Sequence, residues 1–462
     1  MMRKWLFIVV CALVLVGCKE YTVSGDPSLR LSFSTDTLRF DTVFTDQGSA
    51  TSRLMVYNHN ASAIEIERVS MSVGAEFYIN IDGESDPSRM THFVINGHDS
   101  AFVFVRVDID PNKANNPFLV TDKLHFHLNN GVSQQVQLEA YGQNVHRLKG
   151  KDGKLFVNSY IFADTLPYLI YDTMVIDGKM TMLPGARLYM HRNACIYAQG
   201  DVEALGTVDQ PIIIRGDRLD RLFDSVPYAY AGGSWNGIYL VSDQPQNYEL
   251  HYVDILSGNI GLYCSSTCTD PLPQLRMDGC RIHNHTKYGL VLNHIDALVT
   301  NTEISNCASY CVYCAGGKQD FVHTTVASYF GCTNIRIQNV SKEDVAAVYI
   351  DDLSKTAPKT NTSFYNSIIT GHRDHQLIVA TPFEQYYPGH FTGCFIGADT
   401  AKVFVNDYYK YKEYVYYDFH LDSISPAIGI GDSLMAVPYP TDRDGYSRAY
   451  LIPDAGCYQH QP

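Results

Sequence analysis

One run of four adjacent ionisable side chains could do acid–base chemistry. His372, Arg373, Asp374 and His375 follow an expected strand over 365–370. On a bend of the chain they could supply a general base, a general acid and a contact to an anion. A solvated turn is the alternative without chemistry. We therefore take the four residues as candidate catalytic residues and nothing more specific.

A second group alternates along the chain. Arg281, His283, His285 and Lys287 occupy every second position, so a strand would place all four on one face. Such a basic, aromatic line could hold an acidic ligand on an otherwise acidic protein. The alternative is an outward strand face that is merely solvated. These four residues are the candidate ligand-binding residues.

Other polar groups are less suited to a site. Asp351 and Asp352 are adjacent, so on a strand their carboxylates diverge. No pair of histidines combines with an acid at the spacing of a metal site. The sequence therefore predicts neither a metal nor a cofactor.

A repeat of 22 residues indicates the elements that position these side chains. Ile282, Ile304 and Val326 occupy equivalent positions in successive copies, and Ile255 belongs to an earlier copy with a longer spacing. Short strand-like runs at such a period indicate stacked coils rather than one closed globular core. The offset also places Glu303 beside Arg281, which favours a stacked ion pair. No charged clusters align across coils as an active site would require.

The cysteines follow the same register. Of 12 cysteines, Cys264 and Cys314 are equivalent to Leu292 in the coil between them, which predicts small buried side chains rather than disulfides. Cys311 and Cys314 have redox or zinc spacing, but on a strand they point to opposite faces. A local Cys264–Cys268 disulfide remains an alternative in an exported protein.

The N-terminus predicts export and lipidation. Arg3 and Lys4 precede an apolar run over 5–16, which suits a signal peptide better than a membrane span. The run ends in LVGC at 15–18, which resembles a bacterial lipobox. This resemblance implies a signal peptide over 1–17, a lipid on Cys18, a tether over 18–27 and outer-membrane localisation, facing the periplasm or the cell surface. An ordinary signal peptide with a chance cysteine is the alternative.

Composition narrows the choice of partners. The 49 acidic residues exceed the 35 basic ones and give a net charge of −14. No basic stripe exists to neutralise phosphates, so nucleic acid is not an expected partner. The 33 tyrosines suit strands for structural reasons and also suit carbohydrate-facing surfaces.

Residues 28–145 are expected to form a β-sandwich. Seven or eight runs of alternating apolar and polar residues are separated by Asn, Gly, Asp and Pro turns. The strings DTVF at 41–44 and NHNASAIEI at 58–66 resemble the Ig-like modules of bacterial surface proteins in the HYDIN or choice-of-anchor group. The resemblance implies a role in spacing or adhesion.

After a polar joint over 146–153, the chain contains the segments GKMTMLPGARLYM at 178–190, WNGIYL at 235–240, SPAIGIGD at 425–432, DRDGYSR at 442–448 and PDAGCY at 453–458. These segments resemble those of the right-handed parallel β-helix proteins of the pectin-lyase-like fold, and the resemblance covers residues 155–460. The resemblance implies an all-β, single-stranded helix with a C-terminal cap. At about 22–28 residues per coil, this part of the chain would form about eleven to thirteen coils. The resemblance also implies that Asp442, Arg443 and Asp444 form a structural turn. Two insertions, at 219–233 and 351–359, interrupt the regular coils and are expected to project as loops.

The fold of that family hosts polysaccharide lyases and glycoside hydrolases, which makes glycan cleavage an analogy rather than a finding. Because no catalytic constellation is evident, we expect a membrane-anchored lipoprotein that binds a glycan or a surface partner without catalysis. One alternative is a polysaccharide lyase or glycoside hydrolase using the run at 372–375. A purely structural or adhesive surface protein is the other.

Overall fold

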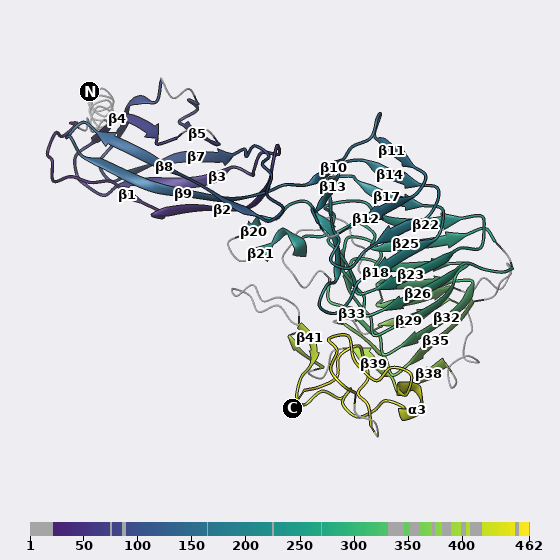
Figure 1. Cartoon of the computed structure of the whole chain (residues 1–462). Helices are drawn as coiled ribbons and strands as arrows, with labels where there is room; N and C mark the ends of the chain where they lie inside the picture. The colour runs from purple at the N-terminus through teal and green to yellow at the C-terminus, as the bar shows by residue number, and fades with distance from the viewer. Residues whose placement is uncertain are drawn as a thin grey trace, which may run out of the picture. The chain divides into compact units, whose positions relative to one another are not determined.

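The computed structural model describes residues 22–461, apart from 74–75, 86–88, 164, 224–225, 269, 331–345, 352–359, 372–374, 381–389, 399–402, 407–417 and 449–451. Cys18 and the candidates His372, Arg373 and Asp374 therefore lie outside the described residues. The chain divides into two compact units, and the boundary in the sequence lies between Asn144 and Val145 (Figure 1). Strands are the main secondary structure of both units, which confirms the all-β class.

The first unit is a sandwich of two sheets around one core. Between its described strands, pairing is antiparallel except for the parallel pair of β2 and β9. Val105 of β7 and Phe126 of β8 are fully buried members of the same apolar cluster, although they belong to different sheets. The four-stranded sheet has the order β1 (Ser32–Phe33), β3 (Ser52–Asn58), β7 (Asp99–Val107), β5 (Phe77–Ile81). The five-stranded sheet has the order β2 (Thr37–Phe44), β9 (Ser133–Gln143), β8 (Phe118–Leu128), β4 (Ile64–Met71), β6 (Thr91–Ile95).

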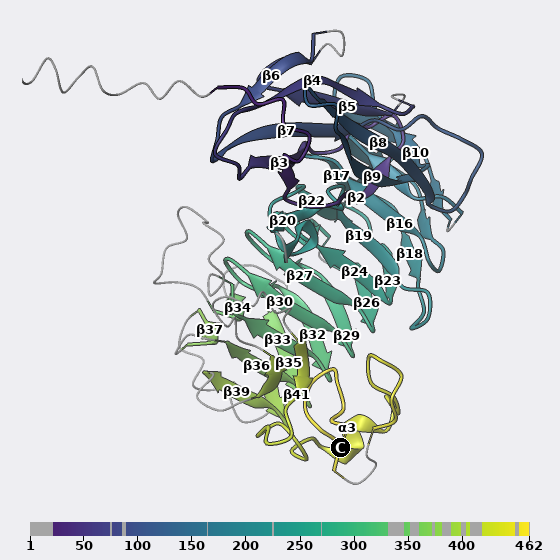
Figure 2. The same cartoon turned by 90° about the vertical axis from the view of Figure 1, so that its left-hand side faces the viewer.

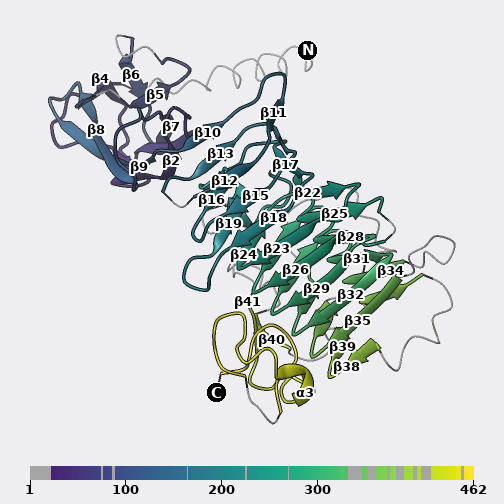
Figure 3. The same cartoon turned by 45° about the vertical axis from the view of Figure 1, so that its right-hand side comes forward.

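The second unit contains three long parallel sheets, and each turn of the chain adds one strand to each of them, an arrangement compatible with a β-helix (Figures 2 and 3). Sheet I comprises β10 (His146–Leu148), β13 (Tyr168–Ile170), β16 (Arg187–Met190), β19 (Ile212–Gly216), β24 (Val253–Leu256), β27 (Arg281–His285), β30 (Glu303–Cys307), β33 (Thr325–Ser328), β36 (Ile368–Gly371) and β39 (Phe395–Ala398).

Sheets II and III stack in the same way. Sheet II comprises β11 (Lys154–Val157), β14 (Thr173–Ile176), β17 (Cys195–Ala198), β22 (Gly237–Ser242), β25 (Leu262–Ser266), β28 (Leu290–Asn293), β31 (Val312–Ala315), β34 (Val348–Asp351) and β37 (Leu377–Val379). Sheet III comprises β12 (Tyr160–Phe162), β15 (Met180–Met182), β18 (Val202–Leu205), β23 (Asn247–His251), β26 (Gln274–Asp278), β29 (Asp296–Thr300), β32 (Gly317–Val322), β35 (Thr360–Tyr365) and β38 (Phe391–Thr392).

The strand register reproduces the repeat read from the sequence. Ile255, Ile282, Ile304 and Val326 are paired in succession along sheet I, and all four are fully buried. Inward side chains at each second position fill the space between the sheets, while pairing above and below satisfies the backbone. The 22-residue period therefore corresponds to one complete coil.

The cysteine ladder is present as expected. Cys264 pairs with Leu292, which pairs with Cys314, and all three are fully buried. The nine cysteines in the described part of the chain are free thiols, Cys268 included, so the alternative Cys264–Cys268 disulfide is not formed.

Asparagine and glycine allow bends at the ends of strands and between sheets. Asn284, Asn301 and Asn306 take positive φ angles of 61°, 45° and 52°, which asparagine tolerates better than most residues. At Gly261 a Cβ atom would lie 2.6 Å from the carbonyl oxygen of Gly289, so neighbouring coils approach too closely there for any side chain.

Three details differ from the expectation. The parallel sheets begin at β10, inside the segment expected to be a joint. Among the described residues sheet I has ten strands, fewer than the eleven to thirteen coils expected, because some coils are much longer than 22 residues: 43 residues separate Thr324 from its neighbour Ser367 in the next coil. The expected insertion at 219–233 holds β20 (Arg221–Phe223), β21 (Val226–Pro227) and the 3-10 helix η1 (Tyr228–Tyr230), outside the three sheets.

Residues 418–461 form what we call the closing segment. It includes β41 (Asp418–Leu421), which pairs with β40 (Phe404–Asn406), and helix α3 (Ser433–Ala436). Phe419, Ala427 and Cys457 pack in one buried cluster with Ala327 and Ile368 of sheet I. Figures 1 and 2 show this yellow segment beside the later coils. Among the described residues, no helix has the length and apolar character needed to cross a membrane.

Candidate functional site

The expected basic line on β27 is not an exposed face. His283 and His285 are only 5% and 0% exposed, whereas Arg281 is partly buried and Lys287 lies beyond the strand in solvent. The prediction of four outward side chains was therefore wrong. His283 lies under the closing segment, since its ring meets Phe419 at 6.3 Å between centroids. His285 points into the bend, where its Nε2 bonds the carbonyl oxygen of Ile255.

Two arginines meet one carboxylate at this place. Arg281 donates through Nη2 to Oδ2 of Asp254 at 2.6 Å, and Arg443 of the closing segment donates through Nη2 to Oδ1 at 2.7 Å. Arg443 also donates through Nε to the carbonyl oxygen of Cys280 at 3.3 Å. Asp254 is therefore held on both oxygens, and the closing segment is pinned to β24 and β27 by charge-assisted hydrogen bonds.

Glu303 lies beside Arg281 in the register of sheet I, as expected, but its direct hydrogen bonds go elsewhere. Its carboxylate accepts from the hydroxyls of Tyr458 and Ser305, each at 2.6 Å. Burial alone would raise the pKa of Glu303, but the positive charges of Arg281 and nearby groups outweigh burial and lower it. Glu303 is thus a buried, ionised anchor for Tyr458.

His420 is clamped between two carboxylates at the edge of this cluster. Its Nδ1 lies 2.5 Å from Asp418 and its Nε2 lies 2.7 Å from Asp444. These hydrogen bonds raise the pKa of His420 to about 10, so the imidazole is charged at neutral pH. Its ring also packs on Tyr458 at 4.2 Å between centroids.

The charged groups of this cluster are bonded to side chains of the same cluster. Asp254, Glu303, Asp418 and Asp444 each accept a hydrogen bond from a side chain of the same cluster. Glycoside hydrolysis needs one carboxyl group to protonate the leaving oxygen and another to act on the sugar or on water. Carboxylates already committed to arginine, tyrosine and histidine are poorly placed for either role, so the geometry fits closure of the fold better than catalysis.

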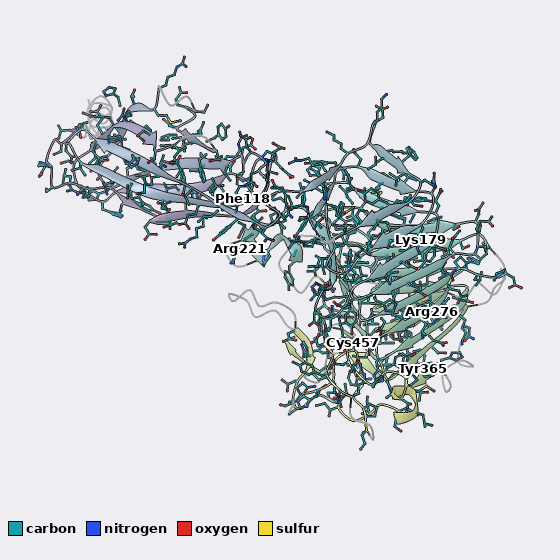
Figure 4. All side chains as sticks on the ribbon, in the orientation of Figure 1. Phe118, Lys179, Arg221, Arg276, Tyr365 and Cys457 are labelled. Atoms are coloured by element: carbon teal, nitrogen blue, oxygen red, sulfur yellow. The ribbon has the colours of Figure 1, made fainter. Side chains whose placement is uncertain are left out.

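A pocket of 310 Å³ opens on the other side of the same closing segment, over sheet III. Its floor comes from three successive coils and its wall from the turn after helix α3. Figure 4 labels Arg276 on sheet III and Cys457 in the closing segment. The lining residues are His251, Arg276, Met277, Asp278, Leu298, Thr300, Asn301, Pro438, Tyr439, Pro440 and Thr441.

The coil register assembles the polar floor. His251, Asp278 and Thr300 are paired neighbours at the ends of β23, β26 and β29. Asp278 Oδ1 accepts from the Thr300 hydroxyl at 2.6 Å and from Asn301 Nδ2 at 3.1 Å. Arg448 donates through Nη2 to Oδ1 of Asn301 at 2.7 Å and so fixes the Asn301 side chain. These side-chain contacts therefore hold the polar residues of the pocket floor in one conformation.

Two further side chains give the pocket its binding chemistry. Arg276 is exposed, and no ion pair among the described residues engages its guanidinium. Tyr439 contributes an aromatic wall. Burial, together with the negative charges of Asp278 and Asp320, raises the pKa of Tyr439, so its phenol stays protonated and can donate. An aromatic surface with a few fixed donors and acceptors is suited to an uncharged or weakly charged polar ring.

The remaining candidates do not join this pocket. His375 is exposed after β36 and is not among the lining residues. Asp351 accepts a hydrogen bond from the Tyr313 hydroxyl at 2.7 Å on sheet II, and Asp352 lies outside the described residues. Asp442, Arg443 and Asp444 belong to a tight turn, in which Asp442 Oδ1 accepts from the amides of Asp444 and Tyr446.

The 22-residue offset already brings Asp278 opposite Thr300, so part of the pocket floor could have been found from the sequence. The wall could not, because Tyr439 lies far along the chain and no repeat relates it to the coils. For the same reason the sequence could not pair Arg443 with Asp254.

No family model and no curated protein matches this chain. Among solved structures it is similar to a protein of unknown function from Porphyromonas gingivalis, at 11% identity over 26% of this chain and 52% of that chain, with a TM-score of 0.19. It is also similar to a family 123 glycoside hydrolase from Clostridium perfringens, at 10% identity over 26% and 30% of the two chains, with a TM-score of 0.19.

A third similar structure is the ASH/PapD-like domain of human CEP192, at 13% identity over 28% of this chain and 96% of that domain, with a TM-score of 0.18. The chain thus spans about half or less of the length of the first two proteins. Likenesses this slight carry no argument about the fold or the function.

Proposed function

We propose that this chain is an exported lipoprotein, anchored to the outer membrane through Cys18, that binds a glycan and does not cleave it. In this proposal the first unit is an Ig-like spacer and the second is a right-handed parallel β-helix of the pectin-lyase-like fold. The glycan binds in the pocket between sheet III and the closing segment.

The pocket carries the proposal. Its volume of 310 Å³ lies at the small end of the range for ligand sites, which suits a terminal or branching sugar unit rather than a long chain. Tyr439 can cover one face of a sugar ring. Arg276 and His251 can bond ring hydroxyls, while Asp278 accepts from them.

The absence of cleavage rests on the neighbouring charge cluster. Its carboxylates are held by Arg281, Arg443, Tyr458 and His420, so the acidic residues of that cluster already have structural partners. Within the pocket, Asp278 is a single carboxylate with one oxygen accepting two hydrogen bonds. Hydrolysis by a carboxylate pair has no second member there among the described lining residues.

The experiment is a binding survey with a matched pair of variants. The Cys18→Ala chain would be applied to an array of neutral and acidic glycans, and each hit measured by calorimetry. Arg276→Ala and Tyr439→Ala should each weaken binding by about tenfold, because each removes a principal contact. Lys179→Ala is the control: Lys179 is an exposed cation just before β15 of sheet III, remote from the pocket lining, and pairs with Glu203 at 2.8 Å.

Silence across the array would refute the proposal. So would binding that survives both pocket substitutions. The same glycans would be incubated with the protein and assayed for new reducing ends and for unsaturated products. Turnover that is lost in His375→Ala would instead establish the lyase or hydrolase alternative.

A further inference from the structure

The outer face of the four-stranded sheet in the first unit carries large exposed side chains. Phe102 and Phe104 of β7 are 44% and 41% exposed, and Tyr78 of β5 is 51% exposed. The intervening Val103 is buried, because side chains alternate between the two faces of a strand. Strand pairing brings a methionine and two arginines beside these rings. We call the six outward residues the aromatic face: Arg53, Met55, Tyr78, Phe102, Phe104 and Arg106.

The members of the aromatic face contact one another. The rings of Phe102 and Phe104 stack with centroids 6.2 Å apart and an angle of 11° between their planes. The guanidinium carbon of Arg53 lies 5.3 Å from the centre of the Phe102 ring, and that of Arg106 lies 5.1 Å from the centre of the Tyr78 ring. A guanidinium over a ring still has N–H donors at its rim for an oxygen ligand. Among the described residues, no carboxylate forms an ion pair with either arginine.

The aromatic face is positive on an acidic protein. The chain has a net charge of −14, yet the other outward residues of this sheet are uncharged: Ser32, Tyr57, Asn80 and Ser100. Asp99 begins β7, but its position along the strand has the opposite parity to Phe102 and Phe104. Two cations without an acidic neighbour on the described part of this face are suited to a surface of negative charge.

The place where the N-terminal segment joins the sandwich indicates which surface this is. Val23 forms a bridge with Ala63, and the amide of Ser24 donates to the carbonyl oxygen of Ala63 at 2.9 Å. The chain is therefore attached to the sandwich from Val23 onward. Only residues 19–22 separate Val23 from the proposed lipid on Cys18. Five residue steps span at most about 18 Å, even when they are fully extended.

Ala63 lies at the same end of the sheet as part of the aromatic face. It follows the turn after Asn58, which is the last residue of β3. Phe102 pairs with Met55, three residues before Asn58, so Phe102 lies about 10 Å along the strand from that end. An acyl anchor this close would keep the bilayer within reach of the aromatic face, so that even a weak attraction to lipid would be sufficient.

The chemistry of the aromatic face matches a phospholipid surface. Aromatic side chains are favoured at the boundary between headgroups and acyl chains, and arginine binds phosphate through paired N–H donors. Basic residues close to an anionic membrane add to the attraction. The rings alone would also suit a soluble protein partner, but the anchor would bring the bilayer to this part of the chain.

We propose that the aromatic face docks on a phospholipid bilayer, with Phe102, Phe104 and Tyr78 in the headgroup boundary and Arg53 and Arg106 on lipid phosphates. The inference rests on the proposed anchor at Cys18 and goes beyond it. The sandwich is then not a free spacer, because one of its two sheets lies against the membrane. The pocket and its glycan take no part in this contact.

The test holds the chain on a bilayer without relying on lipidation. A Cys18→Ala chain with a histidine tag in place of residues 1–17 is bound to vesicles of phosphatidylethanolamine, phosphatidylglycerol and a nickel-chelating lipid. Trp235 is then the only native tryptophan, and its signal is subtracted from that of the probe, Phe104→Trp. Since such rings enter about 5–10 Å into the boundary, brominated acyl chains should quench the probe by about twofold.

Tyr141→Trp is the matched control. Tyr141 is 48% exposed on β9, a strand of the other sheet, and brominated lipid should leave a tryptophan there unquenched. Exchange of both Arg53 and Arg106 for glutamine should reduce the quenching of Phe104→Trp, and so should high salt, because each weakens the attraction to phosphate. Melting temperatures check that the variants fold, and Tyr78→Trp is a second probe on the same face.

Equal quenching of Phe104→Trp and Tyr141→Trp would overturn the inference. So would a Phe104→Trp probe shielded from both brominated lipid and dissolved iodide, because a second copy or another protein would then cover the face. Palmitate labelling of the wild-type chain tests the anchor separately. An unlabelled Cys18 with a quenched probe would contradict the anchor alone, whereas a labelled Cys18 with an unquenched probe would contradict the contact alone.

Discussion

The guanidinium of Arg443 lies 2.7 Å from the carboxylate of Asp254, although 189 residues separate them in the sequence. This contact joins the last part of the chain to β24 in the middle of sheet I. Since Arg281 holds the other oxygen of Asp254, the aspartate bridges two coils and the closing segment. The pocket wall at Tyr439 is therefore positioned by the same segment that this contact fixes.

Loss of the Asp254 carboxylate should destabilise the second unit. Asp254→Asn leaves Arg281 and Arg443 without their common anion in a largely buried place, and we expect a loss of about 3–5 kcal/mol in unfolding free energy. Urea unfolding can be followed by tryptophan fluorescence, because Trp235 is buried in the core of this unit and the chain's other tryptophan, Trp5, lies in the expected signal peptide.

An exposed ion pair is the control for that measurement. Glu203→Gln breaks the contact between Lys179 and Glu203, whose side chains are 48% and 37% exposed. The change should cost less than about 1 kcal/mol. Equal effects of the two substitutions would show that the Asp254 contact does not hold the closing segment.

Stability should pass through a maximum near pH 6.5. Burial lowers the pKa of His283 to about 4 and of His285 and His323 to about 3. Below about pH 6.5 these histidines take up protons in the unfolded chain but stay neutral in the folded protein. The free energy of unfolding therefore falls as the pH drops below about 6.5. His420 acts oppositely: its pKa is raised to about 10, so its contribution is complete below about pH 6.5 and is lost as the pH rises towards 10.

The melting temperature between pH 4 and pH 10 measures both limbs. His420→Gln should flatten the alkaline limb and leave the acid limb in place, because the three buried histidines are untouched. If the alkaline limb were unchanged in His420→Gln, the hydrogen bonds of His420 with Asp418 and Asp444 would not be the cause of that limb.

The cysteine ladder should be chemically silent in the folded protein. Burial raises the pKa of the Cys280 and Cys314 thiols to about 12, which leaves almost no thiolate at neutral pH. Ellman's reagent should react with partly exposed Cys268 first and with Cys264, Cys280 and Cys314 only on unfolding. Cys268→Ser should reduce the early reaction to the slower reaction of Cys195 and Cys394, which are also partly exposed but whose pKa values burial raises. Fewer free thiols in the denatured, unreduced protein would reveal disulfides instead.

Anchoring should depend on one cysteine. The wild-type chain should label with palmitate in bacterial cells and partition into detergent, and Cys18→Ala should do neither, since stable attachment requires several buried acyl chains. Cys11→Ala is the matched control, because Cys11 lies within the expected signal peptide. A membrane-bound Cys18→Ala protein would contradict the anchor.

The repeat made the interior of the second unit predictable. Once Ile282 and Ile304 are aligned, the pairing of Cys264 with Leu292 and of Arg281 with Glu303 follows, because one coil equals one period. Local alternation was equally informative for the sandwich strands. Both signals depend on residues close in sequence, or related by a fixed offset.

The errors arose where distant parts of the chain meet. His283 and His285 alternate with apolar residues just as outward side chains do, yet the closing segment and the tight bend bury them. Arg281 forms its ion pair with Asp254 in the preceding coil, and not with the expected partner Glu303. The burial by the closing segment is not encoded in the period, since that segment has no copy in the coils. Asp254, by contrast, is the register partner of Arg281, in a coil whose spacing is longer than 22 residues.

The most direct test of the glycan-binding proposal is a crystal structure of the Cys18→Ala chain with the oligosaccharide that binds it best. The account predicts a sugar ring against Tyr439, within hydrogen-bonding distance of Arg276 and His251. A bound oligosaccharide that leaves this pocket empty, or contacts only the residues around His375, would contradict it.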